Sequence, residues 1–89
     1  GTEYVNQAIQ FPDREEWETD RQCVTFPALV NGMQLTCAIR GATLQQRFGG
    51  DTPEQWLAAF CLHRWDLEEE AEALIRDQQE DDQGWVWVS

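Results

Sequence analysis

The dipeptide Asn31–Gly32, set between two runs of alternating residues, is the clearest structural signal in this sequence and constrains its fold most. Asparagine and glycine best tolerate the positive φ angles of a type I′ turn, which joins two antiparallel strands through a two-residue loop. Such a loop fixes the register of the hairpin, in which the paired residues are Val30 with Met33, Ala28 with Leu35, Phe26 with Cys37 and Val24 with Ile39. These side chains share one face, so strands Val24–Val30 and Met33–Ile39 are predicted to form an apolar sheet surface.

Pro27 places a limit on the first of these strands. In the predicted register it lies opposite Thr36 in a non-hydrogen-bonded pair, so the amide that proline lacks would point away from the hairpin partner. We therefore expect the Val24–Val30 strand to lie at an edge of the sheet or to be interrupted on its outer side.

The stretch from Gly49 to Gln78 predicts the longest regular element. Thr52 fits the N-cap of a helix, and Pro53 fits the first helical position, where a missing amide costs nothing. Gln55 stands three residues after the cap, where its side chain can reach back to the cap amide as in a capping box.

The apolar residues of this predicted helix form a stripe that must be buried. At 3.6 residues per turn they fall within one sector, which contains Trp56, Phe60, Leu67, Ala71 and Leu74, with Leu57 and Ile75 beside it. Leu62 and Trp65 lie on the opposite side, where a straight helix would leave them in water. We expect the long helix to bend near His63 to Asp66 and Trp65 to make a second contact.

The remaining stretches complete the predicted fold. Val5–Phe11 predicts an N-terminal strand, Asp13–Gln22 a turn or single helical turn, Ala42–Phe48 a short helix, and Trp85–Val88 a strand with tryptophans on one face and valines on the other. The predicted class is α+β: an antiparallel sheet, containing the hairpin and both terminal strands, packed on the short helix and the long, bent one. At a sheet edge, the last strand would invite pairing with a second copy or another protein.

Length and hydropathy define the class of protein. Eighty-nine residues predict a single domain over 1–89, with Gly1–Val5 as a tag, linker or disordered segment. No apolar run approaches the roughly 20 residues that span a bilayer, so no membrane partner is expected. No charged segment followed by an apolar one begins the chain, and we expect a cytoplasmic location.

The cysteines give the same expectation of a reducing compartment. Cys23, Cys37 and Cys61 are odd in number and lack the CxxC spacing of a zinc site. Cys61 and His63 stand about 200° apart around a helix, so they cannot hold one ion together. We interpret the cysteines as reduced structural thiols and predict no metal ligands.

The charge balance is extreme, with 17 acidic residues against six arginines and a formal net charge of −11. Because binding phosphates requires a basic face, nucleic acid is a poor partner and no direct binding of it is expected. The acidic run between Asp66 and Asp82 is typical of a solvated face. A second interpretation is that it imitates a phosphate backbone or docks on a basic partner, through residues such as Asp66, Glu69, Glu70 and Asp77.

At this point the order of the pieces resembles a known family. The segments are NQAIQFPDREEW, VTFPALVNGMQLTCAI, ATLQQRFG and the closing WVWVS. Together they are similar to small bacterial proteins of the domain-of-unknown-function 1488 family. The resemblance implies a compact α+β fold in a bacterial cytoplasm and brings no activity, cofactor or catalytic residue.

The sequence supports an enzyme less well than a binding protein. His63 is the only histidine, no glycine-rich nucleotide cradle is present, and we predict no catalytic or cofactor-binding residues. One hypothesis is a protein-interaction module, with an unknown protein or a second copy as partner, that uses exposed tryptophans: Trp17, Trp65, Trp85 and Trp87. The alternative is an acidic mimic of nucleic acid, or decoy for a basic surface. A third interpretation stays open beside these two: a small stable protein whose partner or ligand leaves no trace in the sequence.

Overall fold

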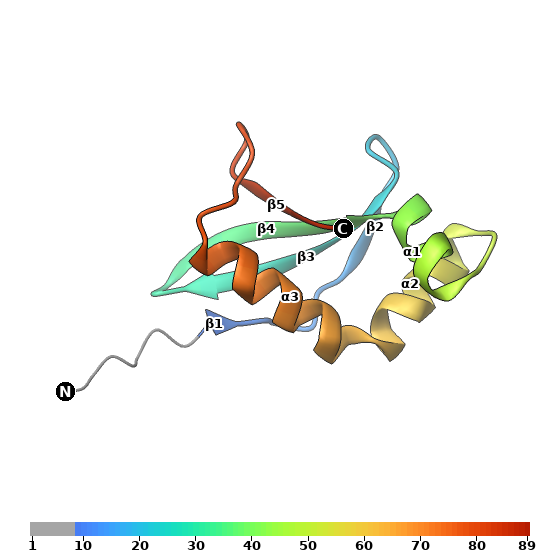
Figure 1. Ribbon diagram of the computed structural model, residues 1–89, viewed down its shortest axis with the longest axis horizontal. Coiled ribbons are helices and arrows are strands. Elements are labelled where there is room, and N and C mark those ends of the chain that lie inside the picture. The colour runs from blue at the N-terminus through green and yellow to red at the C-terminus, as the bar shows by residue number, and fades with distance from the viewer. Residues whose placement is uncertain (1–8) are drawn as a thin grey trace.

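The computed structural model describes residues 9–89, which form a five-stranded sheet and three helices (Figure 1). In chain order the elements are β1 (Ile9–Gln10), β2 (Glu16–Glu18), β3 (Cys23–Val30), β4 (Met33–Arg40), α1 (Gly41–Phe48), α2 (Pro53–Leu62), α3 (Arg64–Arg76) and β5 (Trp85–Val88). The predicted α+β class is confirmed. The tag or linker predicted at Gly1–Val5, and most of the predicted Val5–Phe11 strand, lie outside the described residues.

The β3–β4 hairpin forms in the predicted register, from Val30 paired with Met33 to Val24 paired with Ile39. Asn31 and Gly32 have φ angles of 53° and 82°, as a type I′ turn requires. One face of the hairpin contributes to the core, although Met33 at its tip is 68% exposed. The buried core residues are Val24, Phe26, Ala28, Cys37, Ile39, Leu44, Phe60, Leu67, Ala71, Ile75, Val86 and Val88.

The outer side of β3 is interrupted around Pro27, as predicted. β1 pairs with Leu29 and Val30 at one end of the strand. β2 pairs with the other end, from Cys23 to Thr25. Within residues 9–89, the middle of β3 therefore has a strand partner only on the β4 side.

The strand β2 corrects the prediction of a turn or helical turn over Asp13–Gln22. Trp17 pairs with Val24 and so faces the core side of the sheet, where its ring packs against Trp56 with 5.6 Å between ring centroids. This tertiary contact stabilises an extended conformation in a short acidic segment that has little strand propensity of its own.

The strand β5 joins the sheet, as predicted, but it runs parallel to β4. The sheet is therefore mixed instead of wholly antiparallel, with β5 at its edge. Three helices connect β4 to β5, and such a crossover is what a parallel pair requires. Val86 and Val88 enter the core while both tryptophans of β5 are half-buried, so the predicted division of its faces is confirmed.

The start of the predicted long helix is also confirmed. The Thr52 hydroxyl accepts a hydrogen bond from the Gln55 amide at 3.2 Å, and Pro53 occupies the first helical position. The Gln55 side chain, however, accepts from the Asp51 amide at 2.6 Å, one residue before the position that a capping box would use.

The predicted bend is a complete break at His63, which separates α2 from α3. The His63 amide donates to the Ala59 carbonyl at 3.0 Å, and its own carbonyl accepts from the Leu67 amide at 3.1 Å. The imidazole stacks on Phe48 of α1, with 3.9 Å between centroids and 6° between planes. The break keeps Phe60 and Leu67 in one core while the chain changes direction between them.

Candidate interaction surface

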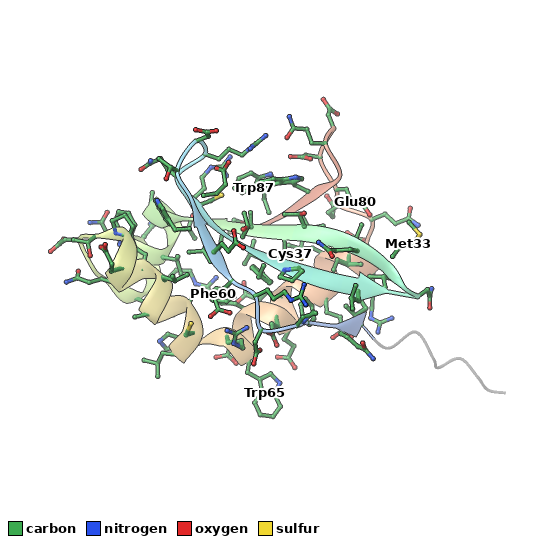
Figure 2. All side chains as sticks on the ribbon, turned by 180° about the vertical axis from the view of Figure 1, so that it is seen from behind. Met33, Cys37, Phe60, Trp65, Glu80 and Trp87 are labelled. Carbon is green, nitrogen blue, oxygen red and sulfur yellow. The ribbon has the colours of Figure 1, made fainter. Side chains whose placement is uncertain are left out.

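The junction between α2 and α3 exposes two large apolar side chains. Leu62, the last residue of α2, is 80% exposed, and Trp65, at the second position of α3, is 81% exposed. The second contact predicted for Trp65 was therefore wrong, because the break directs Leu67 into the core and leaves the indole in water. Figure 2 shows Trp65 projecting away from the body of the protein, on the side opposite Trp87.

A groove of about 240 Å³ lies beside Trp65, between α3 and the β1 segment. Its apolar residues, apart from Trp65 itself, are the half-buried Ile9 and Phe11. Its acidic wall comes from α3, where residues spaced three, four and seven positions after Trp65 share its side of the helix: Glu68, Glu69 and Glu72. The groove therefore combines an aromatic rim with carboxylates.

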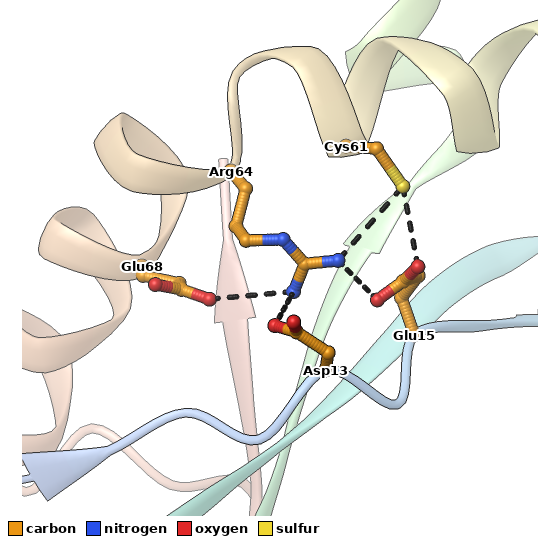
Figure 3. A network of polar contacts seen from close by, with 5 residues as sticks. All are labelled: Asp13, Glu15, Cys61, Arg64 and Glu68. Atoms are coloured by element: carbon orange, nitrogen blue, oxygen red, sulfur yellow. Dashed lines mark hydrogen bonds and ion pairs between the residues drawn. The ribbon is translucent and has the colours of Figure 1, made fainter.

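A polar network centred on Arg64 lies at the same junction of α2 and α3 (Figure 3). The Arg64 guanidinium forms ion pairs with Asp13 at 3.3 Å, with Glu68 at 3.4 Å and with Glu15. The Cys61 thiol donates to the second Glu15 oxygen at 3.2 Å. These contacts join the end of α2 and the start of α3 to the segment that leads into β2.

The network shifts the pKa values of its members. The hydrogen bond from Arg64 holds the pKa of Glu15 below its ordinary value. Partial burial raises the pKa of Glu68. Burial and the hydrogen bond to Glu15 raise the pKa of the Cys61 thiol, which disfavours the nucleophilic thiolate.

The other two cysteines are buried and not activated. Loss of solvation on burial raises the pKa of Cys23 to about 11 and that of Cys37 to about 12. Within residues 9–89, no three side chains of the metal-binding types come together in an arrangement that could hold an ion. None of the helices in the same range is long and apolar enough to cross a bilayer.

Trp85 and Trp87 lie on the sheet face that the helices leave uncovered, with 5.7 Å between ring centroids. Each ring carries an arginine: Arg21 lies 4.4 Å from the Trp85 centroid and Arg40 lies 4.2 Å from that of Trp87. The Trp87 indole N–H donates to Asp81 at 2.9 Å. Both rings of this pair thus already make contacts within the chain, and they cover this face of the sheet.

The remaining residues predicted for interaction are dispersed. Trp17 is half-buried against Trp56, so much of its surface is used in packing. Glu70 forms an ion pair with Arg47 at 2.7 Å. Asp77 caps the end of α3 and accepts from Gln79. Asp66 is exposed beside Trp65 in the chain, but only Glu69 among the predicted acids lines the groove.

Sequence reasoning missed four residues of the groove. Glu68 and Glu72 were within reach of prediction, because helical spacing from Trp65 places them on its side. Ile9 and Phe11 come from the other end of the chain, and no local pattern connects them with α3.

The fold and this surface define a class: a small α+β domain with a mixed sheet and an exposed aromatic and acidic helix junction. The chain belongs to the DUF1488 family, described as "Protein of unknown function (DUF1488)", whose sequence model matches residues 9–88. This confirms the family that the sequence resembles.

Named relatives and a solved structure agree with this membership. The chain is 75% identical over 84 residues to "Uncharacterized protein YrdB" of Escherichia coli K12, covering 94% of this chain and 99% of the relative. The protein of the same name in Shigella flexneri is 74% identical over the same shares. The crystal structure of a DUF1488 protein from Shewanella loihica PV-4 superposes with a TM-score of 0.88 at 32% identity, covering 94% of each chain. These descriptions assign no activity.

Proposed function

We propose that this protein is a non-enzymatic protein-interaction module whose contact surface is the helix junction around Leu62 and Trp65. The observation that carries the proposal is the 81% exposure of Trp65 on a regular helix. Tryptophan is the residue type most enriched where interfaces concentrate their binding energy. Removing most of an indole's surface from water contributes about 4 kcal/mol before the cost of association.

The junction is also held rigidly, which lowers the cost of binding. Leu67 anchors the first turn of α3 in the core, and Arg64 ties the same turn to the segment before β2. A side chain presented by an ordered backbone loses little conformational entropy when a partner covers it. Trp65 is therefore better prepared for binding than an aromatic residue on a mobile loop.

An acidic decoy is supported less well than an apolar anchor. Three acids of α3 already bind arginines of the same chain: Glu68 with Arg64, Glu70 with Arg47 and Glu72 with Arg76. These pairs reduce the row of unpaired charges that a mimic of a phosphate backbone would need. We therefore favour a surface in which charge accompanies an aromatic contact.

Affinity capture from a bacterial lysate tests the proposal with one matched pair of variants. Trp65→Ala removes the exposed indole, whereas Met33→Ala removes a 68% exposed apolar side chain at the hairpin tip. We expect the wild type and Met33→Ala to capture the same protein and Trp65→Ala to lose it. All three should unfold within about 0.5 kcal/mol of one another, because exposed substitutions change stability little.

Two outcomes decide against this surface. Capture of the same protein by Trp65→Ala would show that another face binds it, and no specific capture by the wild type would remove the case for a heterologous partner. Light scattering tests whether the partner is a second copy of the chain. A dimer that Trp65→Ala converts to a monomer, and that Met33→Ala does not, would identify such self-association.

A further inference from the structure

We infer that the groove beside Trp65 binds a basic segment of a partner protein, one that inserts an apolar side chain and flanks it with arginine or lysine. This inference rests on the proposed function, since it gives the chemistry of the partner for the same surface. It is carried by the groove between α3 and β1, which is lined by three apolar residues and by three glutamates of α3.

The size of the groove and its three apolar residues fit a protein side chain. Its volume of about 240 Å³ is smaller than the roughly 300 to 1,000 Å³ typical of small-molecule sites. Ile9 and Phe11 are half-buried and pack against the core, so they provide a firm apolar contact. Trp65 also lines the groove, and its exposed ring can contact an inserted aliphatic group.

The glutamates of the groove favour a partner of positive charge. Glu68 and Glu72 are ion-paired with arginines of the chain. Glu69 is exposed, and within residues 9–89 its side chain makes no hydrogen bond or ion pair, so both of its oxygens can accept from a partner.

The whole molecule reinforces this local preference. With a net charge of −11, the chain repels acidic segments and attracts basic ones over distances of about a Debye length, which is about 8 Å in physiological salt. A groove that places three apolar side chains beside glutamates, one of them unpaired, therefore favours a segment that is both basic and apolar.

Two synthetic peptides that differ only in charge test this inference. Both have the same pattern of leucines in an amphipathic helix, but one has lysine at the polar positions and the other has glutamine. Binding is followed by NMR through the indole N–H signal of Trp65, assigned with Trp65→Phe. We expect the lysine peptide to shift this signal and to bind more tightly than the glutamine peptide.

A matched pair of charge variants locates the effect. Glu69→Gln should weaken binding of the lysine peptide about two- to fivefold, as the loss of one exposed ion pair predicts. Glu80→Gln makes the same change on the opposite side of the molecule (Figure 2) and should leave the affinity unchanged. Trp65→Ala should abolish binding of both peptides at this groove; because this variant lacks the indole, its binding is followed through the backbone amide signal of Glu69.

The outcomes separate the inference from the proposed function. Equal affinity for both peptides, with no effect of Glu69→Gln, would overturn the basic partner and leave the apolar anchor standing. Equal losses in Glu69→Gln and Glu80→Gln would reduce the effect to diffuse charge and also overturn it. Undiminished binding to Trp65→Ala would refute the contact surface itself. A Trp65 signal that shifts with protein concentration alone would assign the groove to a second copy and overturn the basic partner.

Discussion

Replacing Gly41 by alanine should destabilise this protein, although alanine is the better helix former. Gly41 is buried and begins α1 directly after β4. A Cβ atom there would lie 2.8 Å from Cε3 of Trp56 and 2.9 Å from Cη2 of Trp17. Both atoms belong to indole rings that pack on each other, so neither ring can rotate away freely.

The magnitude follows from two opposing contributions. Inserting a methyl group into a packed site costs about 1 to 3 kcal/mol, and close contacts with two large rings place Gly41→Ala near the upper end. The better helix propensity of alanine relative to glycine offsets at most about 1 kcal/mol of this cost. The expected net loss is about 2 kcal/mol, which lowers the melting temperature by about 8 to 16 °C in a domain of this size.

Urea unfolding followed by circular dichroism measures this loss without relying on the tryptophans. Ala42→Gly, at the exposed next position of α1, reports the alanine and glycine difference in the same helix without a clash. Trp17→Phe removes the Cη2 atom, so in that background Gly41→Ala should cost at least about 0.5 kcal/mol less. If Gly41→Ala stabilises the protein, or adds independently to Trp17→Phe, the packing argument is wrong.

The remaining predictions concern the polar and thiol groups. At pH 8, a thiol-specific disulfide reagent should label one cysteine of the native protein, Cys61, and reach Cys23 and Cys37 only after denaturation; labelling of two before unfolding would contradict their burial. Because Arg64 holds the folded pKa of Glu15 below 4.5, their ion pair stabilises the protein above pH 4.5 and is lost as the pH falls through the lowered pKa. Glu15→Gln should therefore cost about 1 kcal/mol at pH 7 and progressively less below pH 4.5 in urea titrations; a pH-independent difference would exclude this linkage.

The features that could be predicted from sequence depend on neighbours in the chain. The Asn31–Gly32 turn sets the hairpin register within a few residues on either side, and Thr52 and Pro53 define the helix start in the same way. The apolar stripe predicted the buried face on both sides of His63, because the break preserves which residues meet the sheet.

The features that were missed depend on contacts between distant parts of the chain. The strand β2 is stabilised by the packing of Trp17 on Trp56 and by its pairing with Val24. Neither contact is visible in a local sequence pattern. The helical crossover that precedes β5 permits a parallel pair with β4, but no local pattern of residues distinguishes that direction from an antiparallel one.

The candidate surface likewise contains residues that the sequence predicted and residues that depend on distant contacts. Its α3 residues Trp65 and Glu69 were among the residues predicted for interaction. The opposite wall at Ile9 and Phe11 becomes visible only when β1 is placed beside the helix.

The interrupted outer side of β3 has a consequence for the behaviour of this protein in concentrated solution. A long, continuous strand edge offers a template on which copies can stack into fibrils. Here the edge is divided between two very short strands, and at its open centre Pro27 has no amide to donate to an incoming chain. An apolar hairpin can thus supply five of the twelve buried core residues without becoming a nucleus for aggregation.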